Sequence, residues 1–219
     1  MAVKVGLKYI EIWGESMEDR IADYEKEPII KDQIVFYGPS YFTRWSARFG
    51  MKPMREVLLG KSGAECVVNR GFGSSCAEHQ LYYYSRMIRP LEPRVLVYHC
   101  IANGSSFGYS VEESWEIGQR VIAWAEADFP DIQIYICGMS PLLRERNASE
   151  LAACERVKGY MSRFASMREN RHYIDVLSYE PIASRKDIFV EDGVHFNQDG
   201  YDIYTELFKE VLKDELAKY

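Results

Sequence analysis

A carboxylate and an imidazole lie three residues apart near the carboxyl end of the chain, in the segment Asp192-Gly193-Val194-His195. A compact turn with this spacing brings the Asp192 carboxylate to one ring nitrogen of His195 and leaves the other nitrogen free to act as a base. Such a base needs a nucleophile, and the candidate is Ser40 in the first third of the chain. Taken alone, an Asp and a His on a surface loop would be an equally ordinary explanation, so the hypothesis depends on the other segments.

Together these residues would supply the groups that acyl transfer from an ester requires. Ser40 would attack the carbonyl, His195 would accept the serine proton, and Asp192 would fix the tautomer of His195 and stabilise its charged form. The developing oxyanion needs donors, and the candidates are the N–H of Ser40, the N–H of Gly73 and the side-chain amide of Asn103. Loss of one such donor typically lowers kcat by about 10²- to 10³-fold.

The elements that would position these residues follow an alternating pattern. Five short apolar segments predict buried strands at residues 33–37, 66–69, 94–100, 132–137 and 173–177. Five helices are also predicted. The first begins at Ser40 and the second follows the Gly73 loop and ends near residue 89. The others cover about residues 110–127, 149–170 and 202–217. Strands that alternate with helices predict an α/β fold with three α/β/α layers around a five-stranded parallel sheet.

We expect one domain over residues 1–219, in which residues 1–30 form a helical extension packed on the outside of the sheet. Apolar residues at spacings of three and four predict that helix over about residues 8–27: Ile10, Trp13, Met17, Ile21 and Tyr24. In parallel sheets the ligand crevice opens at the carboxyl ends of the strands. Ser40, Gly73, Asn103 and the Asp192/His195 loop all follow strands or lie near that edge, so we expect them to converge there.

Four blocks in this order resemble the GDSL/SGNH hydrolases. The blocks are Gly38-Pro39-Ser40, the run from Asn69 to Gly73, the loop that carries Asn103, and the run from Asp192 to Asn197, and the resemblance spans residues 34–201. It implies a flavodoxin-like sheet and a metal-free esterase, lipase, thioesterase or carbohydrate deacetylase. It also implies that Ser40 is the nucleophile, Gly73 and Asn103 are oxyanion donors, and Asp192 and His195 form the acid–base pair.

Two of the four blocks depart from the family pattern. Pro39 stands where the family usually has Asp or Ser, and its fixed φ should stiffen the turn before Ser40. The third block reads Ile101-Ala102-Asn103-Gly104 rather than Gly-x-Asn-Asp. We therefore expect Asn103 to be held less firmly, and a non-catalytic binding module with a degraded oxyanion loop is the alternative from a different functional class.

Composition excludes several other classes. The chain has 219 residues and a net charge of -6, with acidic and basic residues well mixed, and the absence of a basic stripe argues against a nucleic-acid partner. No run approaches the roughly 18 apolar residues of a membrane span, and we expect no membrane partner and no secretory signal. Five widely spaced cysteines, an odd number, are typical of reduced thiols in a cytoplasmic protein.

Cofactor-dependent alternatives have less support. Four histidines without an HxH or HExxH pair argue against a metal hydrolase, and we expect no cofactor. Gly71 and Gly73 resemble part of a phosphate-binding loop, but the full GxGxxG pattern and the P-loop lysine are missing. His99 is expected in the core and His79 near the Gly73 loop, whereas Phe42 and Trp45 are expected to line a pocket.

The sequence thus predicts a cytoplasmic serine esterase that hydrolyses small acyl esters through an acyl-enzyme intermediate. Among small-molecule esters we favour carbohydrate O-acetyl esters, by analogy at the level of the fold. A lysophospholipase or thioesterase is the alternative within the same class. Acyl-chain length, the alcohol part of the substrate and the oligomeric state are not encoded in any pattern that we can interpret.

Overall fold

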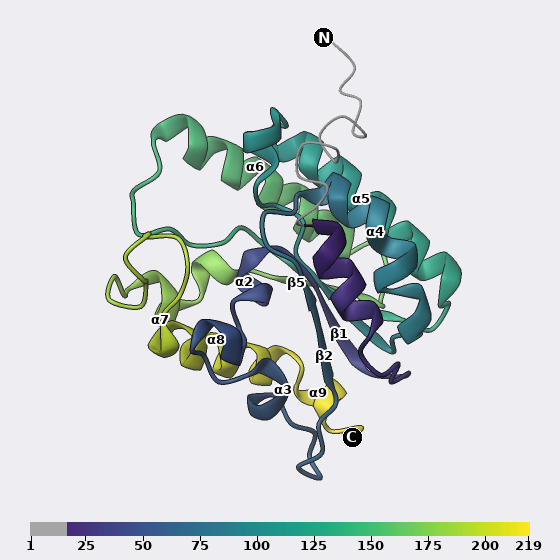
Figure 1. The fold of residues 1–219 in the computed structure, drawn as a ribbon. Coiled ribbons are helices and arrows are strands. Elements are labelled where there is room, and N and C mark those ends of the chain that lie inside the picture. Colours follow the sequence, from purple (N-terminus) through teal and green to yellow (C-terminus); the bar gives the residue numbers. More distant parts are fainter. Residues whose placement is uncertain (1–16) are drawn as a thin grey trace.

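The computed structural model describes residues 17–219, which contain a single five-stranded parallel sheet (Figure 1). Its strands are β1 (Ile34–Gly38), β2 (Val67–Gly71), β3 (Val95–Tyr98), β4 (Gln133–Cys137) and β5 (Arg171–Ile174). They pair in the order β2-β1-β3-β4-β5, and each pair is parallel. This order is that of flavodoxin-like sheets, in which the chain reverses its direction of travel between β1 and β3.

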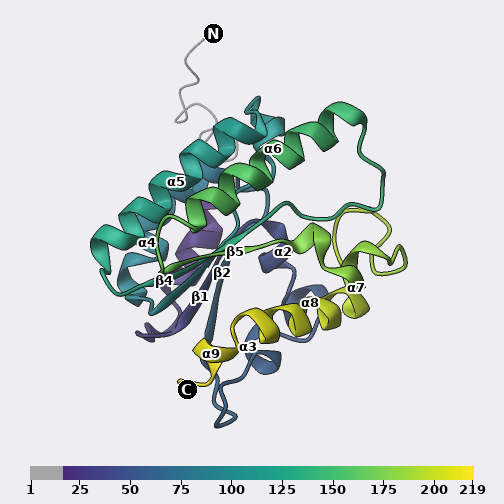
Figure 2. The same ribbon diagram turned by 180° about the vertical axis from the view of Figure 1, so that it is seen from behind.

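Helices cover both faces of this sheet, which confirms the predicted three-layer fold (Figures 1 and 2). On one face lie the helix at residues 17–25, α4 (Ala77–Met87), α5 (Val111–Asp128) and α6 (Ala148–Ala165). On the other lie α3 (Met54–Val57), α7 (Glu180–Ala183), α8 (Gln198–Val211) and α9 (Lys213–Leu216). The short helix α2 (Ser40–Thr43) lies at the carboxyl end of β1.

The predicted elements are present, with differences at their ends. β5 begins two residues earlier than expected and ends at Ile174, because this edge strand opens with the polar pair Arg171 and His172 rather than with an apolar run. The apolar residues that prompted the later prediction instead form a 3-10 turn, Val176–Ser178. The helix predicted to reach residue 170 ends at Ala165, and α8 begins at Gln198, four residues before the predicted start.

The predicted amino-terminal helix is observed over residues 17–25, where Met17 and Ile21 are buried against the sheet layer. Residues 8–16 of that prediction, including Ile10 and Trp13, lie outside the described residues, and the helix ends at residue 25 rather than at about residue 27. Tyr24 donates a hydrogen bond of 2.5 Å to the carbonyl of Gly71. This contact ties the helix to the carboxyl end of β2, so the extension is attached next to the edge where ligands bind in such folds.

The core beneath α8 is built from aromatic rings. Phe36 of β1 packs edge-on against Phe208 of α8 with ring centroids 4.9 Å apart, and Trp45 stacks on Tyr201 at 5.5 Å. Phe42 and Trp45 are buried in this cluster and do not line the cavity described below, so the prediction that they line a pocket is wrong. The helix that begins at Ser40 turns its aromatic face inward because α8 offers a large apolar surface there.

Candidate active site

Ser40 is the first residue of α2, directly after β1 and Pro39. Two contacts fix this helix on β2. The Asn69 side-chain amide donates to the Phe42 carbonyl at 2.7 Å, and a β-carbon on Gly71 would lie only 2.5 Å from the backbone nitrogen of Thr43. The glycine therefore lets α2 pack directly on the strand, and Ser40 is held at the carboxyl edge of the sheet.

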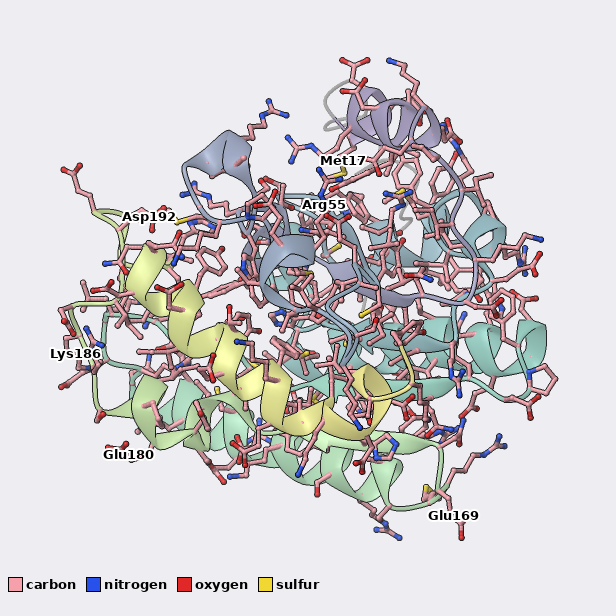
Figure 3. The ribbon with its side chains drawn as sticks, turned by 90° about the horizontal axis from the view of Figure 1, so that it is seen from below. Met17, Arg55, Glu169, Glu180, Lys186 and Asp192 are labelled. Atoms are coloured by element: carbon pink, nitrogen blue, oxygen red, sulfur yellow. The ribbon has the colours of Figure 1, made fainter. Side chains whose placement is uncertain are left out.

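His195 lies on a hairpin formed by residues 188–197, which precedes α8. The N–H of Val190 donates to the His195 carbonyl at 2.9 Å, and the N–H of Asn197 donates to the Ile188 carbonyl at 3.0 Å. Gly193 adopts a φ of +64° at the tip, a conformation that glycine adopts readily. Figure 3 shows Asp192 on the loop that leads into α8.

The Asp192 carboxylate closes this hairpin. One oxygen, Oδ1, accepts the backbone N–H groups of Val194 and His195, both at 2.9 Å, and Oδ2 accepts from Nδ1 of His195 at 2.7 Å. Partial burial alone would raise the pKa of Asp192, but the hydrogen bonds from the His195 backbone, the His195 ring and the Val194 backbone outweigh it and lower the pKa to about 2. Asp192 is therefore ionised at neutral pH and acts only as an acceptor.

The other ring nitrogen of His195, Nε2, lies 2.8 Å from Ser40 Oγ. Because ionised Asp192 can only accept, Nδ1 of the neutral ring carries the proton and Nε2 is the acceptor for the Ser40 hydroxyl. The structure thus brings Ser40 to the pair formed by His195 and Asp192, although Ser40 and His195 are 155 positions apart in the sequence. Their geometry allows a proton to pass from the hydroxyl to the imidazole.

Two side chains that the sequence analysis did not select support this arrangement. A guanidinium nitrogen of Arg44 lies 3.3 Å from Asp192 Oδ2. The Tyr41 hydroxyl is within hydrogen-bonding distance of the carbonyls of Pro141, at 2.6 Å, and of Val194, and its single proton can be donated to one of them at a time. Tyr41 is next to Ser40 on α2 and Arg44 caps the carboxyl end of that helix, so the segment that carries the candidate nucleophile also holds the loop that carries the candidate base.

The predicted oxyanion donors lie on two loops next to Ser40. A β-carbon on Gly73 would lie 3.9 Å from Ser40 Cβ, and the N–H of Gly73 makes no hydrogen bond within the described part of the chain. The Asn103 amide nitrogen donates one hydrogen to the Ser75 carbonyl at 2.9 Å, which leaves its second hydrogen for another acceptor. Asn103 itself has a φ of +59°, in the left-handed region that Asn tolerates better than most residues.

The two departures in the Asn103 loop have structural reasons. Ile101 is buried and packs in the core on the α5 side of the sheet, so it does not occupy the turn. A β-carbon on Gly104 would lie 2.2 Å from Ser114 Oγ of α5, so the glycine allows the loop to lie close against that helix. The Asn103 loop is thus held by packing on α5 and by its bond to Ser75, where we expected a looser loop.

These residues surround a cavity of about 300 Å³. Its lining includes Ser40, Gly73, Asn103 and His195, together with two aromatic rings, Phe49 and Phe72. All the predicted site residues except Asp192 therefore face one cavity, and Asp192 lies behind His195. Arg20 and Thr43 also line it. No sequence pattern indicated either residue, because residues that meet at a cavity wall from separate segments do not form a motif with a fixed spacing.

The two remaining histidines of interest lie in the core. His99 is buried, as predicted, and its Nε2 lies 3.2 Å from Ser140 Oγ. His79 is also buried in α4, where its ring packs on Phe107 of the loop after Asn103 and does not line the cavity. Burial lowers the pKa of both rings to about 4, so both are neutral near pH 7.

The fold is shared with solved structures of low sequence similarity. A GDSL-like lipase from Bacteroides thetaiotaomicron has a TM-score of 0.64 at 14% identity, over 90% of this chain and 97% of the other. A lipase/acylhydrolase from Enterococcus faecalis has a TM-score of 0.64 at 19% identity, over 84% and 96% of the two chains. A variant of an acetyl-xylooligosaccharide esterase from Geobacillus has a TM-score of 0.63 at 13% identity, over 84% and 95%.

No family model and no curated protein sequence matches the chain. The similarity is therefore one of structure, and it extends over most of this chain and nearly all of each neighbour. Together with the strand order, it identifies the fold expected from the four sequence blocks. The chain has the three-layer α/β/α fold of GDSL/SGNH hydrolases.

Proposed function

We propose that this protein is a serine esterase that hydrolyses small acyl esters, with Ser40 as nucleophile, His195 as base and Asp192 as the group that orients the base. The observation that carries the proposal is the pair of contacts in series, 2.8 Å from Ser40 Oγ to His195 Nε2 and 2.7 Å from His195 Nδ1 to Asp192 Oδ2. Ser40 and His195 line one cavity, whose wall also includes the candidate amide donors Gly73 and Asn103.

In the first half of the reaction, Ser40 Oγ bonds to the carbonyl carbon of the ester as its proton passes to His195 Nε2. The carbonyl oxygen becomes an oxyanion, which accepts hydrogen bonds from the N–H groups of Ser40 and Gly73 and from the Asn103 amide. The intermediate then collapses and the bond to the alcohol oxygen breaks. The alcohol takes the proton from His195, and the acyl group remains on Ser40.

In the second half, water attacks the acyl-enzyme carbonyl while His195 accepts a proton from that water. A second oxyanion forms in the same place and collapses with release of the carboxylic acid. The proton on His195 returns to Ser40 Oγ, which restores the resting hydroxyl. Asp192 remains ionised throughout and stabilises the imidazolium that forms in each half.

The size of the cavity favours short acyl groups. About 300 Å³ is at the lower end of the usual range for ligand pockets, a size that suits an acetyl ester. We therefore favour carbohydrate O-acetyl esters over the lipids or thioesters of a lysophospholipase or thioesterase. One structural neighbour is an acetyl-xylooligosaccharide esterase, and lipases and acylhydrolases match the fold equally well. Five free, buried cysteines support a reducing, cytoplasmic location.

Covalent labelling tests the proposed nucleophile directly. A fluorophosphonate probe is expected to label the wild-type protein at one site, identified by mass spectrometry as Ser40, and to leave the Ser40→Ala variant unlabelled. Ser46 provides a matched control, since it lies on the same segment but bonds to the Thr43 carbonyl, and Ser46→Ala is expected to label normally. A folded wild-type protein that is not labelled would instead favour the non-catalytic binding module.

A further inference from the structure

The cavity wall carries positive charge. Two guanidinium groups, those of Arg20 and Arg44, line it, and the lining contributed by residues 17–219 contains no carboxylate. The chain as a whole is acidic, with a net charge of -6. A local excess of positive charge at the mouth of a catalytic cavity in an acidic protein raises the local concentration of anionic ligands.

The two arginines are not equivalent. Arg44 lies 3.3 Å from Asp192, so much of its charge is offset by the carboxylate that orients His195. Arg20 approaches from the amino-terminal helix, and one of its guanidinium nitrogens would lie 3.5 Å from a β-carbon built on Gly73. The same hypothetical β-carbon lies 3.9 Å from Ser40 Cβ, so a single glycine separates the Arg20 side chain from the nucleophile.

The helix that carries Arg20 is fixed to the site. Ile21 is completely buried beside it, and the Tyr24 hydroxyl one turn later donates to the Gly71 carbonyl, two residues before Gly73. Met17, one turn earlier, also lines the cavity. Arg20 is therefore presented by a helix anchored at both sides of it, and its guanidinium is placed to donate to a group bound next to the oxyanion loop.

We propose that Arg20 recognises an anionic group, a carboxylate or a phosphate, in the substrate. This inference rests on the proposed function. An acetyl group carries no charge, so the anionic group must belong to the alcohol half of the ester. The substrate class is therefore O-acetylated uronates or sugar phosphates rather than neutral oligosaccharides. A guanidinium suits both anions because its planar donors match two oxygens of a carboxylate or phosphate.

A matched pair of substrates tests the charge alone. Acetylated glucuronic acid and its methyl ester have the same acetyl groups and differ by one negative charge, and acetylated glucose phosphate beside acetylated glucose gives the phosphate comparison. The wild-type enzyme is expected to have a higher kcat/KM for the charged member of at least one pair. In Arg20→Gln the ratio of charged to neutral kcat/KM is expected to fall roughly 10- to 100-fold, the value of one hydrogen bond to a charged group.

Arg55→Gln is the control for net charge. Arg55 is exposed on α3 and does not line the cavity, so its replacement changes the net charge by the same amount without changing the wall. Both ratios are expected to stay at the wild-type value in this variant. Equal falls in Arg20→Gln and Arg55→Gln, or equal losses on charged and neutral esters in Arg20→Gln, would overturn the assignment of Arg20.

A binding measurement separates this inference from the proposed function. Calorimetry with Ser40→Ala and the same uronate pair is expected to show tighter binding of the acid than of its methyl ester, and the double variant with Arg20→Gln should lose the difference. If the wild-type enzyme hydrolyses both members equally well, esterase activity stands and anion recognition fails. If no ester is hydrolysed but the acid still binds through Arg20, anion recognition stands and the esterase proposal fails.

Discussion

The two sides of the candidate site are held in place by different forces. The side that carries the base is fixed by hydrogen bonds, since Asp192 accepts three N–H groups and Tyr41 bonds to the loop from α2. The side that carries the oxyanion donors is fixed mainly by close packing, because Gly71 and Gly104 leave no room for a β-carbon against α2 and α5. A ring that transfers a proton must be oriented in angle as well as in position, and directional bonds supply that orientation.

The largest effect is expected from breaking the base side at Asp192. In Asp192→Asn the side-chain oxygen can still accept the two backbone N–H groups, but the amide nitrogen cannot accept the Nδ1 proton of His195. The ring then adopts the wrong tautomer, and kcat is expected to fall by about 10⁴-fold, the loss seen when a triad carboxylate is replaced by an amide. The measurement is steady-state hydrolysis of p-nitrophenyl acetate, with circular dichroism to verify the fold.

Arg44→Gln is a suitable companion variant, because it removes the cation that faces Asp192 while leaving all three hydrogen bonds of the carboxylate. Its loss is expected to be much smaller than that of Asp192→Asn. Wild-type turnover by folded Asp192→Asn would show that Asp192 does not orient the base.

An intermediate effect is expected on the donor side. Asn103→Gly removes the amide but preserves the left-handed backbone, since glycine adopts a positive φ without strain. We expect kcat to fall by about 10²- to 10³-fold with little change in KM, as for the loss of one oxyanion donor. Asn103→Ala serves as the comparison, because it should lose the same activity and also some stability from its strained φ. A kcat within twofold of wild type in Asn103→Gly would mean that the two backbone N–H groups suffice.

The fold was predictable because the strands carry strong local signals. Val95–Tyr98 and Ile34–Gly38 are completely buried on both faces, so their apolar runs correctly predicted buried strands. The edge strand β5 was misplaced by two residues because Arg171 and His172 are accommodated by partners outside the strand, Glu126 and Gln133, which no local pattern reveals. An edge strand needs fewer apolar residues than a central one.

The candidate site was predictable in part. Ser40, Gly73, Asn103 and His195 lie directly after or near strand ends in recognisable blocks, and the structure brings them to one cavity. Arg20 and Tyr41 were not predictable in this way. Their importance comes from the tertiary contacts that place them against Gly73 and the Val194 carbonyl, and neither contact leaves a trace in sequence spacing. Phe42 and Trp45 were wrongly predicted to line the pocket. An aromatic residue close to Ser40 in the sequence can pack in the core equally well, and its position in the sequence does not distinguish the two.

The smallest expected effect is on the pH dependence of the free energy of unfolding. Each side of the site has one buried histidine that should contribute to it. His99 contacts the rings of Tyr41 and Phe42 near the base side, and His79 contacts Phe107 on the donor side. Burial lowers the pKa of both from 6.5 to about 4. Because the unfolded chain binds protons first, the stability due to the neutral rings is full above pH 6.5 and is lost as the pH falls towards 4.

Each histidine is therefore expected to contribute up to about 3 kcal/mol of destabilisation over this range. Urea unfolding between pH 7 and pH 4 measures it, and His79→Gln and His99→Gln should each reduce the slope of stability against pH. Asp192, with its pKa of about 2, affects stability in a different pH range. Its contribution to stability is complete above pH 3.8 and is lost only below that pH. A flat wild-type profile between pH 6.5 and 4 would contradict the neutral state of these rings.

The serine and the imidazole that meet at 2.8 Å are separated by 155 positions in the chain. At ordinary rates of synthesis, about 5 to 20 residues per second, a ribosome needs on the order of ten seconds or more to produce the second after the first. During that time the growing polypeptide holds an ordinary, unactivated alcohol. Under the proposed mechanism, fragments released before residue 195 therefore lack esterase activity, and activity begins only once the hairpin that carries His195 has been made and has docked.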